Sequence, residues 1–571
     1  MRKHALYTFA GLGVAALALT APAFGQSYKI ETPKYGGTIE LVSVYATISA
    51  LSWDNADYNW KHNHDTGSVY EQLFVTDVSQ FKSRGGKWTQ TPDAFIPLEN
   101  MRGELAEKWE LKENPLQLVI TLRKGVMWAD KPGIMSAREL TAEDVVYTFN
   151  RQNTSKKRIE GMYDYVTGVK ATDKYTVTFD LKEFNAEWAY RFGYGYYSAI
   201  VPKEVVEAPN NGATNWKNIN GTGPFRLTDY VQGNSNTYEK NPNYWGTETI
   251  NEKEFKLPYL DKLVYRIVKD EATRVTALRT GKIDILEVVR WQDVDSLKKS
   301  APDLKWNRWL ATGGTFLAMR TDTKPFDDIR VRRALNMAVN KEEIIKAYYN
   351  GNAEMYAYPQ HPSFGAYFRP LEQQPDSVKE LFKFDPVKAK KLLAEAGYPN
   401  GFTFKTQVCS CSTDHTDLLP LVVAYLEAVG VKMEIVPMEY AAFLSAMTTR
   451  QNTAGYFMNN GHTNPTRSLH KSFVFGQPWN PSQWNDPAFS AKMDAVYLEK
   501  DEAKRVQMID EMTTEIVDKA PYIWLPTPYV YTAWWPWVKG YEGELRAGAA
   551  RPGPIYARMW IDQDLKKKMG Y

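Results

Sequence analysis

Segments typical of strands and segments typical of helices alternate along most of this chain. LQLVITLRKGVMW (116–128) and YTVTFDL (175–181) carry the apolar and β-branched residues of strands. Between them, LTAEDVVYTFNR (140–151) has a helical pattern in which Thr141 can cap the first turn and Asp144 can answer the cap. Such alternation is typical of helices packed on sheets, so the sequence predicts an α/β fold.

The length of the chain predicts that the fold has more than one unit. A chain of 571 residues is longer than a single hydrophobic core supports, so two or three lobes are expected. Its hydrophobic fraction of 43% and charged fraction of 24% are those of a soluble globular protein. The 18 Trp and 35 Tyr residues can fill cores, and they also suit a ligand cleft lined by flat side chains.

The first 25 residues have the pattern of a secretory signal peptide. MRKH is positively charged, ALYTFAGLGVAALALT is a short apolar run, and APAFGQ offers small residues for cleavage after Ala23 or Gly25. No cysteine follows the apolar run, so a lipid anchor is not expected, and no later stretch is apolar for long enough to span a membrane. A bacterial periplasm is the predicted location.

The net charge argues against a nucleic-acid partner. Arg2 and Lys3 are the charged residues of the signal segment, so its removal lowers the formal net charge from +3 to +1. A nearly neutral protein has no global field that would recruit nucleic acid or an anionic membrane.

The only two cysteines, Cys409 and Cys411, lie in VCSCSTDH. An oxidising compartment permits a bridge between them, but such close spacing would form a small strained ring. Asp414 and His415 nearby make a metal site conceivable, although the spacing matches no zinc pattern. We therefore expect two small thiols that are buried or half-buried.

No catalytic motif stands out in the sequence. The phosphate-binding, dinucleotide-binding, zinc-protease and serine-hydrolase signatures are all missing. His62, His64 and Asp65 in KHNHD could bind a metal, but a solvated loop is the preferred interpretation. The sequence thus predicts a protein without enzymatic activity, metal or cofactor. A secreted glycoside hydrolase remains the alternative from another class, because a carboxylate pair could be present among the many acids.

The stretch GTGPFRLTDYVQGNSNTYEKNPNYWG (221–246) resembles a phosphate loop at first sight. However, Pro224 follows Gly223 directly, and no lysine stands where a phosphate would need one. Gly221 and Gly223 instead suit a tight backbone turn, after which FRLTDYV (225–231) reads as a strand that returns as a hairpin.

With this stretch, several other blocks follow in a recognisable order. Taken together they resemble the large extracytoplasmic solute-binding proteins of ABC importers, family 5, the group that contains the oligopeptide-, dipeptide- and nickel-binding proteins. The blocks are residues 103–149, 221–246, 264–285, 325–345 and 384–401. The likeness extends over roughly residues 35–540, nearly the whole chain after the signal peptide.

The resemblance implies a two-lobed periplasmic-binding-protein fold with a discontinuous first lobe, an extra subdomain and a hinge between the lobes. Such a protein is a monomer that holds a small solute between its lobes and presents the closed form to the membrane permease, without performing chemistry. The expected boundaries are 26–309 for the first lobe with its subdomain at about 66–200, 310–524 for the second lobe, and 525–571 for the return to the first.

The resemblance also bears on the ligand. Peptide-binding members have an aspartate in the second lobe, a few residues before a proline, that pairs with the ammonium group of the peptide. Counting back from Pro465, the matching place falls near Asn460 and Gly461, and residues 456–469 contain no acid. A buried ammonium group needs a charged partner. We therefore expect an oligosaccharide or glycoside, with an oligopeptide or modified peptide as the alternative and nickel less favoured.

The candidate ligand-binding residues combine amide groups for hydroxyls with aromatic rings for the apolar faces of sugars. Arg467 could receive a carboxylate or phosphate, with a surface position as the alternative, and packing is an equal alternative for the aromatic residues. The candidates are Trp53, Trp60, Tyr440, Asn459, Asn460, His462, Asn464, Arg467 and Trp484.

Overall fold

The structure is a computed structural model that describes residues 30–43, 53–88, 95–159, 161–461 and 464–571. The predicted signal peptide lies outside these residues and stays a prediction. None of the helices in the described part combines the length and apolar character that a membrane span requires.

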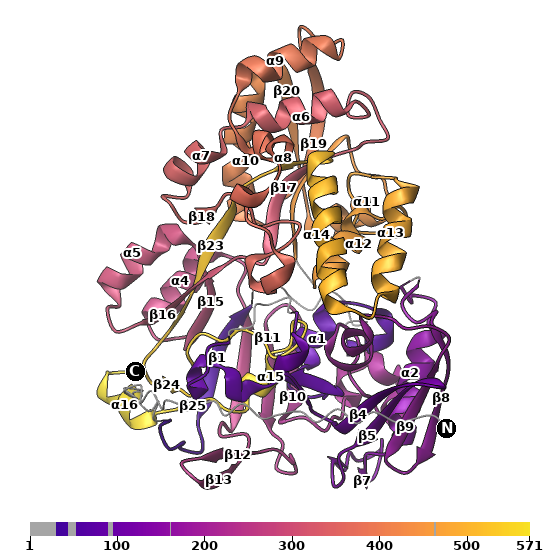
Figure 1. Ribbon diagram of the computed structural model, residues 1–571. Coiled ribbons are helices and arrows are strands. Elements are labelled where there is room, and N and C mark those ends of the chain that lie inside the picture. Colours follow the sequence, from indigo (N-terminus) through magenta and orange to yellow (C-terminus); the bar gives the residue numbers. More distant parts are fainter. Residues whose placement is uncertain (1–29, 44–52, 89–94, 160, 462–463) are drawn as a thin grey trace, which may run out of the picture.

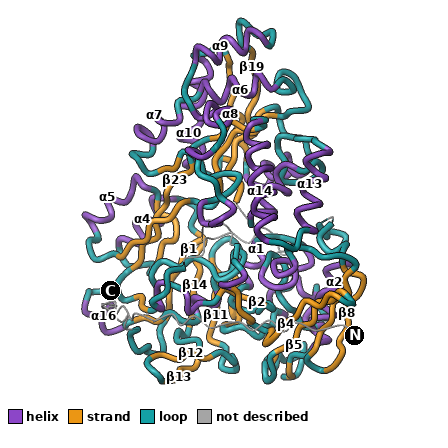
Figure 2. The backbone as a smooth tube through the Cα atoms, in the orientation of Figure 1, coloured by secondary structure: helices purple, strands orange, loops and turns teal. Residues whose placement is uncertain are grey.

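The described chain forms two lobes (Figure 1), and each lobe has a large apolar core of its own. One core gathers buried side chains from residues 39–304 and again from 533–561; we call this part lobe I. The other gathers side chains from residues 316–525; we call this part lobe II. Sheets covered by helices occur in both lobes, which confirms the predicted two-lobed α/β class (Figure 2).

Lobe I contains two four-stranded sheets. In the first, β1 and β14 run parallel and the other neighbours are antiparallel. The second sheet is antiparallel and packs against α2 (Ala142–Asn153), whose first turn has the predicted capping box of Thr141 and Asp144. The strand orders are β1 (Thr38–Ser43), β14 (Lys262–Ile267), β11 (Ser235–Lys240), β10 (Phe225–Val231), and β4 (Ala106–Glu113), β5 (Leu116–Leu122), β9 (Thr176–Leu181), β8 (Val166–Asp173).

Lobe II is built on a five-stranded mixed sheet. Helices flank this sheet in Figure 2. Its central strands β19 and β21 are parallel, whereas β17 is antiparallel to both of its neighbours. The strand order is β20 (Val431–Met438), β19 (Phe402–Cys409), β21 (Gly455–Gly461), β17 (Gly313–Met319) and β22 (Tyr522–Trp524).

A further sheet lies where the chain passes between the lobes. In it, β23 (Thr527–Trp534) pairs with β15 (Ile285–Val289) on one side and with β16 (Lys305–Leu310) on the other. The chain enters lobe II through the two residues between β16 and β17, and it returns through the two residues between β22 and β23. Two adjacent crossings of this kind form a hinge.

The remaining helices and strands complete the two lobes. In lobe I they are α1 (Lys61–Thr66), α3 (Lys203–Val206), α4 (Glu271–Arg279), α5 (Trp291–Ser300), α15 (Gly553–Tyr556), α16 (Gln563–Lys568), and the paired strands β2 (Phe74–Thr76) with β3 (Met101–Gly103), β6 (Met127–Trp128) with β7 (Arg138–Glu139), β12 (Thr247–Ile250) with β13 (Lys253–Lys256), and β24 (Val538–Lys539) with β25 (Trp560–Ile561). Residues 313–525 contribute α6 (Ile329–Ala338), α7 (Lys341–Glu343), α8 (Asp376–Phe382), α9 (Pro386–Glu395), α10 (Thr413–Glu427), α11 (Tyr440–Thr448), α12 (Pro465–Phe473), α13 (Pro487–Leu498), α14 (Glu502–Asp518), and β18 (Ala353–Glu354), which pairs with β23.

The glycine-rich stretch is a structural turn followed by a hairpin, as predicted. The Gly223 amide donates to the Val69 carbonyl oxygen at 2.8 Å. A Cβ atom at Gly221 would approach that same oxygen to 2.0 Å, so only glycine permits this close packing of backbones. β10 then pairs antiparallel with β11.

Buried charges fasten the C-terminal tail into lobe I. Arg551 donates to both carboxylate oxygens of Glu104, at 2.5 and 2.8 Å, and both side chains are shielded from water. Glu71 lies beside this pair and accepts hydrogen bonds from the Trp245 indole nitrogen at 2.9 and 3.1 Å. Burial, and then the negative charge of Glu104, raise the pKa of Glu71 to about 8.

The raised pKa of Glu71 predicts a fall in stability with pH. Between about pH 4.5 and pH 8, the folded state holds a proton that the unfolded state has released, so the free energy of unfolding decreases as pH rises through this window. One proton contributes at most about 1.4 kcal/mol per pH unit. Chemical denaturation of Glu71→Gln should show a shallower decrease, because the amide can still accept from Trp245 but does not titrate. Glu107→Gln, a change at an exposed position of β4, is the control, and identical slopes for all three proteins would contradict the assignment.

Candidate functional site

A cavity of about 540 Å³ lies between the two lobes. Lobe I contributes residues from 57–197, mainly the segment before α1, the segment after α2 and the π-helical turn Tyr190–Tyr194. Lobe II contributes residues from 409–479, which come from the ends of β19 and β21 and from helices α10, α11 and α12. Because its two walls belong to different lobes, the shape of the cavity depends on the hinge.

The lobe I wall is rich in tyrosine. Tyr58, Tyr190, Tyr196 and Tyr197 line the cavity, and the rings of Tyr58 and Tyr197 have centroids 4.9 Å apart. Burial raises the pKa of Tyr197 to about 12 and raises the pKa values of Tyr58 and Tyr190 further. These phenols therefore keep their protons at neutral pH and offer neutral hydroxyl groups together with flat apolar faces.

Arg467 brings a positive charge to the lobe II wall. It lies on α12, where its backbone amide donates to the side chain of the capping residue Asn464 at 2.7 Å. Among the described residues, the Arg467 guanidinium has no carboxylate within salt-bridge distance, and its buried Nε has no hydrogen-bond partner. Its charge lowers the pKa values of Tyr190 and Tyr197, opposing the larger effect of burial. The guanidinium thus faces phenols across the cavity.

Asp57 is the one acidic residue among the described residues that line this cavity. Its Oδ1 accepts from the Lys157 ammonium group at 2.6 Å, whereas its buried Oδ2 has no hydrogen-bond partner in the described part of the chain. Asn460 lies near the place where the resemblance led us to look for an aspartate, and it donates to the Ser472 hydroxyl at 3.0 Å. This stretch of the chain thus offers an amide held inside the lobe rather than an acid.

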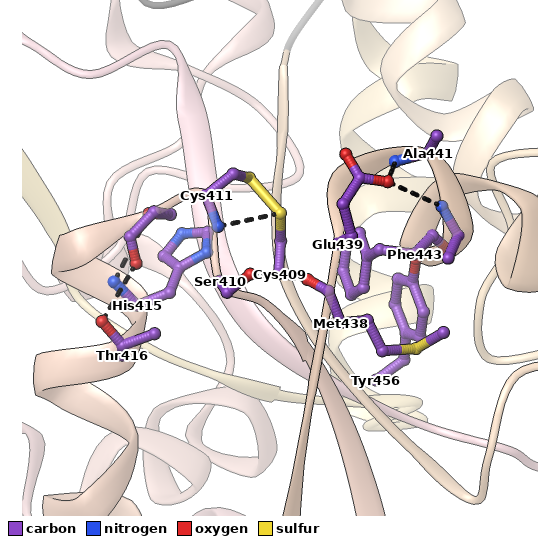
Figure 3. Close-up of a disulfide and its surroundings, with 12 residues drawn as sticks. Cys409, Ser410, Cys411, His415, Thr416, Met438, Glu439, Ala441, Phe443 and Tyr456 are labelled. Carbon is purple, nitrogen blue, oxygen red and sulfur yellow. Dashed lines mark hydrogen bonds between the residues drawn. A yellow bond between two sulfur atoms is a disulfide. The ribbon is translucent and has the colours of Figure 1, made fainter. Parts of the chain in front are cut away.

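Cys409 and Cys411 form a disulfide on the lobe II wall (Figure 3). The expectation of two thiols was wrong. Cys409 ends β19, and the chain then turns tightly so that Cys411 comes just before Ser412, the capping residue of α10. This turn brings the two Cα atoms to 5.1 Å, within the range that a disulfide spans.

The KHNHD segment is a buried helix rather than the solvated loop that we expected. It forms α1, in which the Lys61 ammonium group pairs with Asp65 and His64 also contacts Asp65. Burial lowers the pKa of His64, so its imidazole is neutral at neutral pH. No group of three His, Cys, Asp or Glu side chains in the described part of the chain could hold a metal ion.

The structure brings some of the candidate residues together and separates others. Trp60, Tyr440, Asn459, Asn460 and Arg467 line the cavity, whereas Asn464 lines a smaller cavity beside it. His462 lies outside the described residues.

Two candidate tryptophans lie elsewhere. Trp53 is buried in the lobe I core, with its ring 5.0 Å from that of Tyr230. Trp484 packs half-buried on the core of lobe II, near the guanidinium of Arg332. We did not predict the tyrosines of the lobe I wall, although three of the four residues in YGYY (194–197) are tyrosines and mark a concentration of aromatic side chains.

Comparisons with known proteins agree with this architecture. The family model described as "Bacterial extracellular solute-binding proteins, family 5 Middle" matches residues 100–484. The chain is 29% identical over 495 residues to the dipeptide-binding protein of Escherichia coli, covering 82% of this chain and 89% of that protein. It is 28% identical over 465 residues to heme-binding protein A of Haemophilus influenzae, covering 76% and 81%. Among solved structures, the periplasmic binding protein DppA of Helicobacter pylori in complex with the peptide STSA matches with a TM-score of 0.76, at 24% identity, over 93% of this chain and 99% of that one.

The disulfide gives a direct chemical prediction. The protein denatured without reductant should titrate as free of thiols, and two thiols should appear after reduction. Cys409→Ser should expose one thiol and lower the free energy of unfolding by roughly 1 to 2 kcal/mol, because closing so short a loop removes little chain entropy. Detection of two thiols in the unreduced wild-type protein would be at odds with the structure.

Proposed function

The chain belongs to the bacterial extracellular solute-binding proteins of family 5, and from this premise we propose that its inter-lobe cavity captures a short peptide or a peptide-like carboxylate. The protein is the extracytoplasmic solute-binding component of an ABC importer. We further propose that a cleaved signal peptide delivers it to the periplasm and that it acts as a monomer, binding its solute without turnover.

The proposed class of ligand rests on the guanidinium of Arg467, which is unpaired among the described residues. A guanidinium in a partly enclosed cavity costs free energy when no anion is present, and it binds a carboxylate with two parallel hydrogen bonds. In the described part of the chain no acid compensates it. A ligand carboxylate is the group that would satisfy Arg467, and every peptide with a free C-terminus has one.

The oligosaccharide that we first expected has less support than the peptide alternative. Two of the proteins to which this chain is similar are named for a dipeptide or were solved with a peptide, and neither name mentions a sugar. An unmodified sugar would leave Arg467 without a counter-ion. The tyrosine faces that suit a sugar ring suit apolar side chains of a peptide equally well.

Binding would be read out as closure of the lobes. A ligand that touches both the tyrosines of lobe I and Arg467 of lobe II stabilises the closed form more than the open form, which shifts the population toward closure. The two crossings between β16 and β17 and between β22 and β23 are short enough to act as the hinge. The membrane permease would then recognise the closed pair of lobes.

A pair of peptides tests the role of the carboxylate. Isothermal titration calorimetry of a di- or tripeptide and of its C-terminal amide should show that the amide binds about 10- to 100-fold more weakly, because a charge-assisted hydrogen bond is lost. In Arg467→Gln the two peptides should bind with nearly equal, weak affinity.

Arg330→Gln, an exposed arginine on α6 paired with Asp328, is the matched control and should behave as the wild type. Binding of neutral oligosaccharides with no binding of peptides would contradict the proposal. Release of a chromogenic aglycone from a glycoside would instead favour the hydrolase alternative.

A further inference from the structure

A second, smaller cavity of about 60 Å³ adjoins the ligand cavity. Tyr190 lines both, so its ring stands at the boundary between them. The smaller cavity also lies between the lobes: Glu187 and Tyr194 come from lobe I, whereas Asn464, Glu502 and Arg505 come from lobe II. The lobes touch directly beside it, where the Ala186 amide donates to the Tyr497 carbonyl oxygen at 2.8 Å.

Glu187 is the unusual member of this second cavity. Only 5% of the residue is exposed, and its Oε2 accepts from the Arg191 guanidinium at 2.9 and 3.1 Å. Its Oε1 is buried and has no hydrogen-bond partner among the described residues. A buried carboxylate oxygen without a donor is costly, so Glu187 Oε1 is free to accept a hydrogen bond from a group outside the described chain.

The charged groups around the second cavity are compatible with a bound cation. Arg191 is shared with Glu187, and it also donates to the Met162 carbonyl oxygen at 2.8 Å. Arg505 donates to the carbonyl oxygens of Glu499 and Lys500, both at 2.8 Å. Glu502 adds a further carboxylate, which accepts from Tyr367 at 3.5 Å. A volume of about 60 Å³ suits a small polar group, since one water occupies about 30 Å³ in the liquid.

We propose that Glu187 receives a primary ammonium group of the ligand in this second cavity. The proposal rests on the function proposed above. The Glu187 carboxylate would be the negatively charged partner of the ammonium group, a role that the neutral amide of Asn460 cannot fill. Asn464, which lines the second cavity, is the capping residue of α12, and Arg467, which lines the ligand cavity, follows in the first turn of that helix. A ligand that occupies both cavities beside Tyr190 would place its carboxylate at Arg467 and an ammonium group beside Glu187.

The ammonium group has two possible sources, the N-terminus of the peptide or the end of a lysine side chain. Calorimetry with three peptides separates them: Ala-Lys-Ala, its N-acetyl derivative, and Ala-norleucine-Ala. In the wild type, one of the two modified peptides should bind at least tenfold more weakly than Ala-Lys-Ala. In Glu187→Gln this difference should fall below threefold, while the difference between a peptide and its C-terminal amide persists.

Glu187→Gln weakens a buried ion pair with Arg191 and could therefore disturb the fold. A second variant is needed that changes the cavity and keeps this pair. Ala189→Leu adds side-chain volume to the second cavity while keeping both members of that pair, and it should also remove the preference for the ammonium group. Glu183→Gln, an exposed position four residues before Glu187, should retain it.

The competing acceptor is Asp57, whose Oδ2 is also without a partner in the described residues. Loss of the ammonium preference in Asp57→Asn, with Glu187→Gln unaffected, would overturn the proposal. Equal affinity of the wild type for all three peptides would overturn it as well, while leaving the role of Arg467 standing. Failure of every peptide to bind would overturn the proposed function itself, and the two failures are therefore distinct.

Discussion

The pairing of β16 with β23 is the constraint on which the rest of the architecture depends. Six consecutive residue pairs join these strands, from Lys305 with Trp534 to Leu310 with Tyr529. Lobe II is the whole stretch of chain between them, so it is attached to lobe I by two adjacent crossings and by nothing else along the backbone. The arrangement gives two opposed walls that can approach one another, and it makes every site between the lobes a composite of both.

Incompletely paired charges on these walls are the feature that relates the structure to the choice of ligand. Lobe II presents Arg467 without an acid in the described residues, while lobe I presents two carboxylates, Asp57 and Glu187, that are each only partly satisfied. Such groups are costly in an empty, closed cavity and become favourable once a ligand of opposite charge enters. We therefore expect the two lobes to stay apart until a ligand with a suitable charge pattern binds.

Much of the fold could be predicted from the sequence, because local signals and global fold agree. The capping box of Thr141 and Asp144, the turn at Gly221 and Gly223, and the family resemblance were all confirmed. The site was harder to predict. Trp53 lies in a polar segment yet packs against Tyr230 in the core, and the bridge at Cys409 depends on a tight turn that spacing alone does not reveal. Glu187 gave no signal, since its open oxygen depends on how Arg191 is oriented in the folded lobe.

Selection of a ligand by its carboxylate and ammonium groups can be checked by native mass spectrometry of the protein purified gently from the bacterium that produces it, because tightly bound solutes are retained. We expect an added mass that fragments into amino-acid residues and is released when Arg467 is replaced by Gln. An added mass built of sugar units and retained by that variant would show that the cavity does not select its ligand through Arg467.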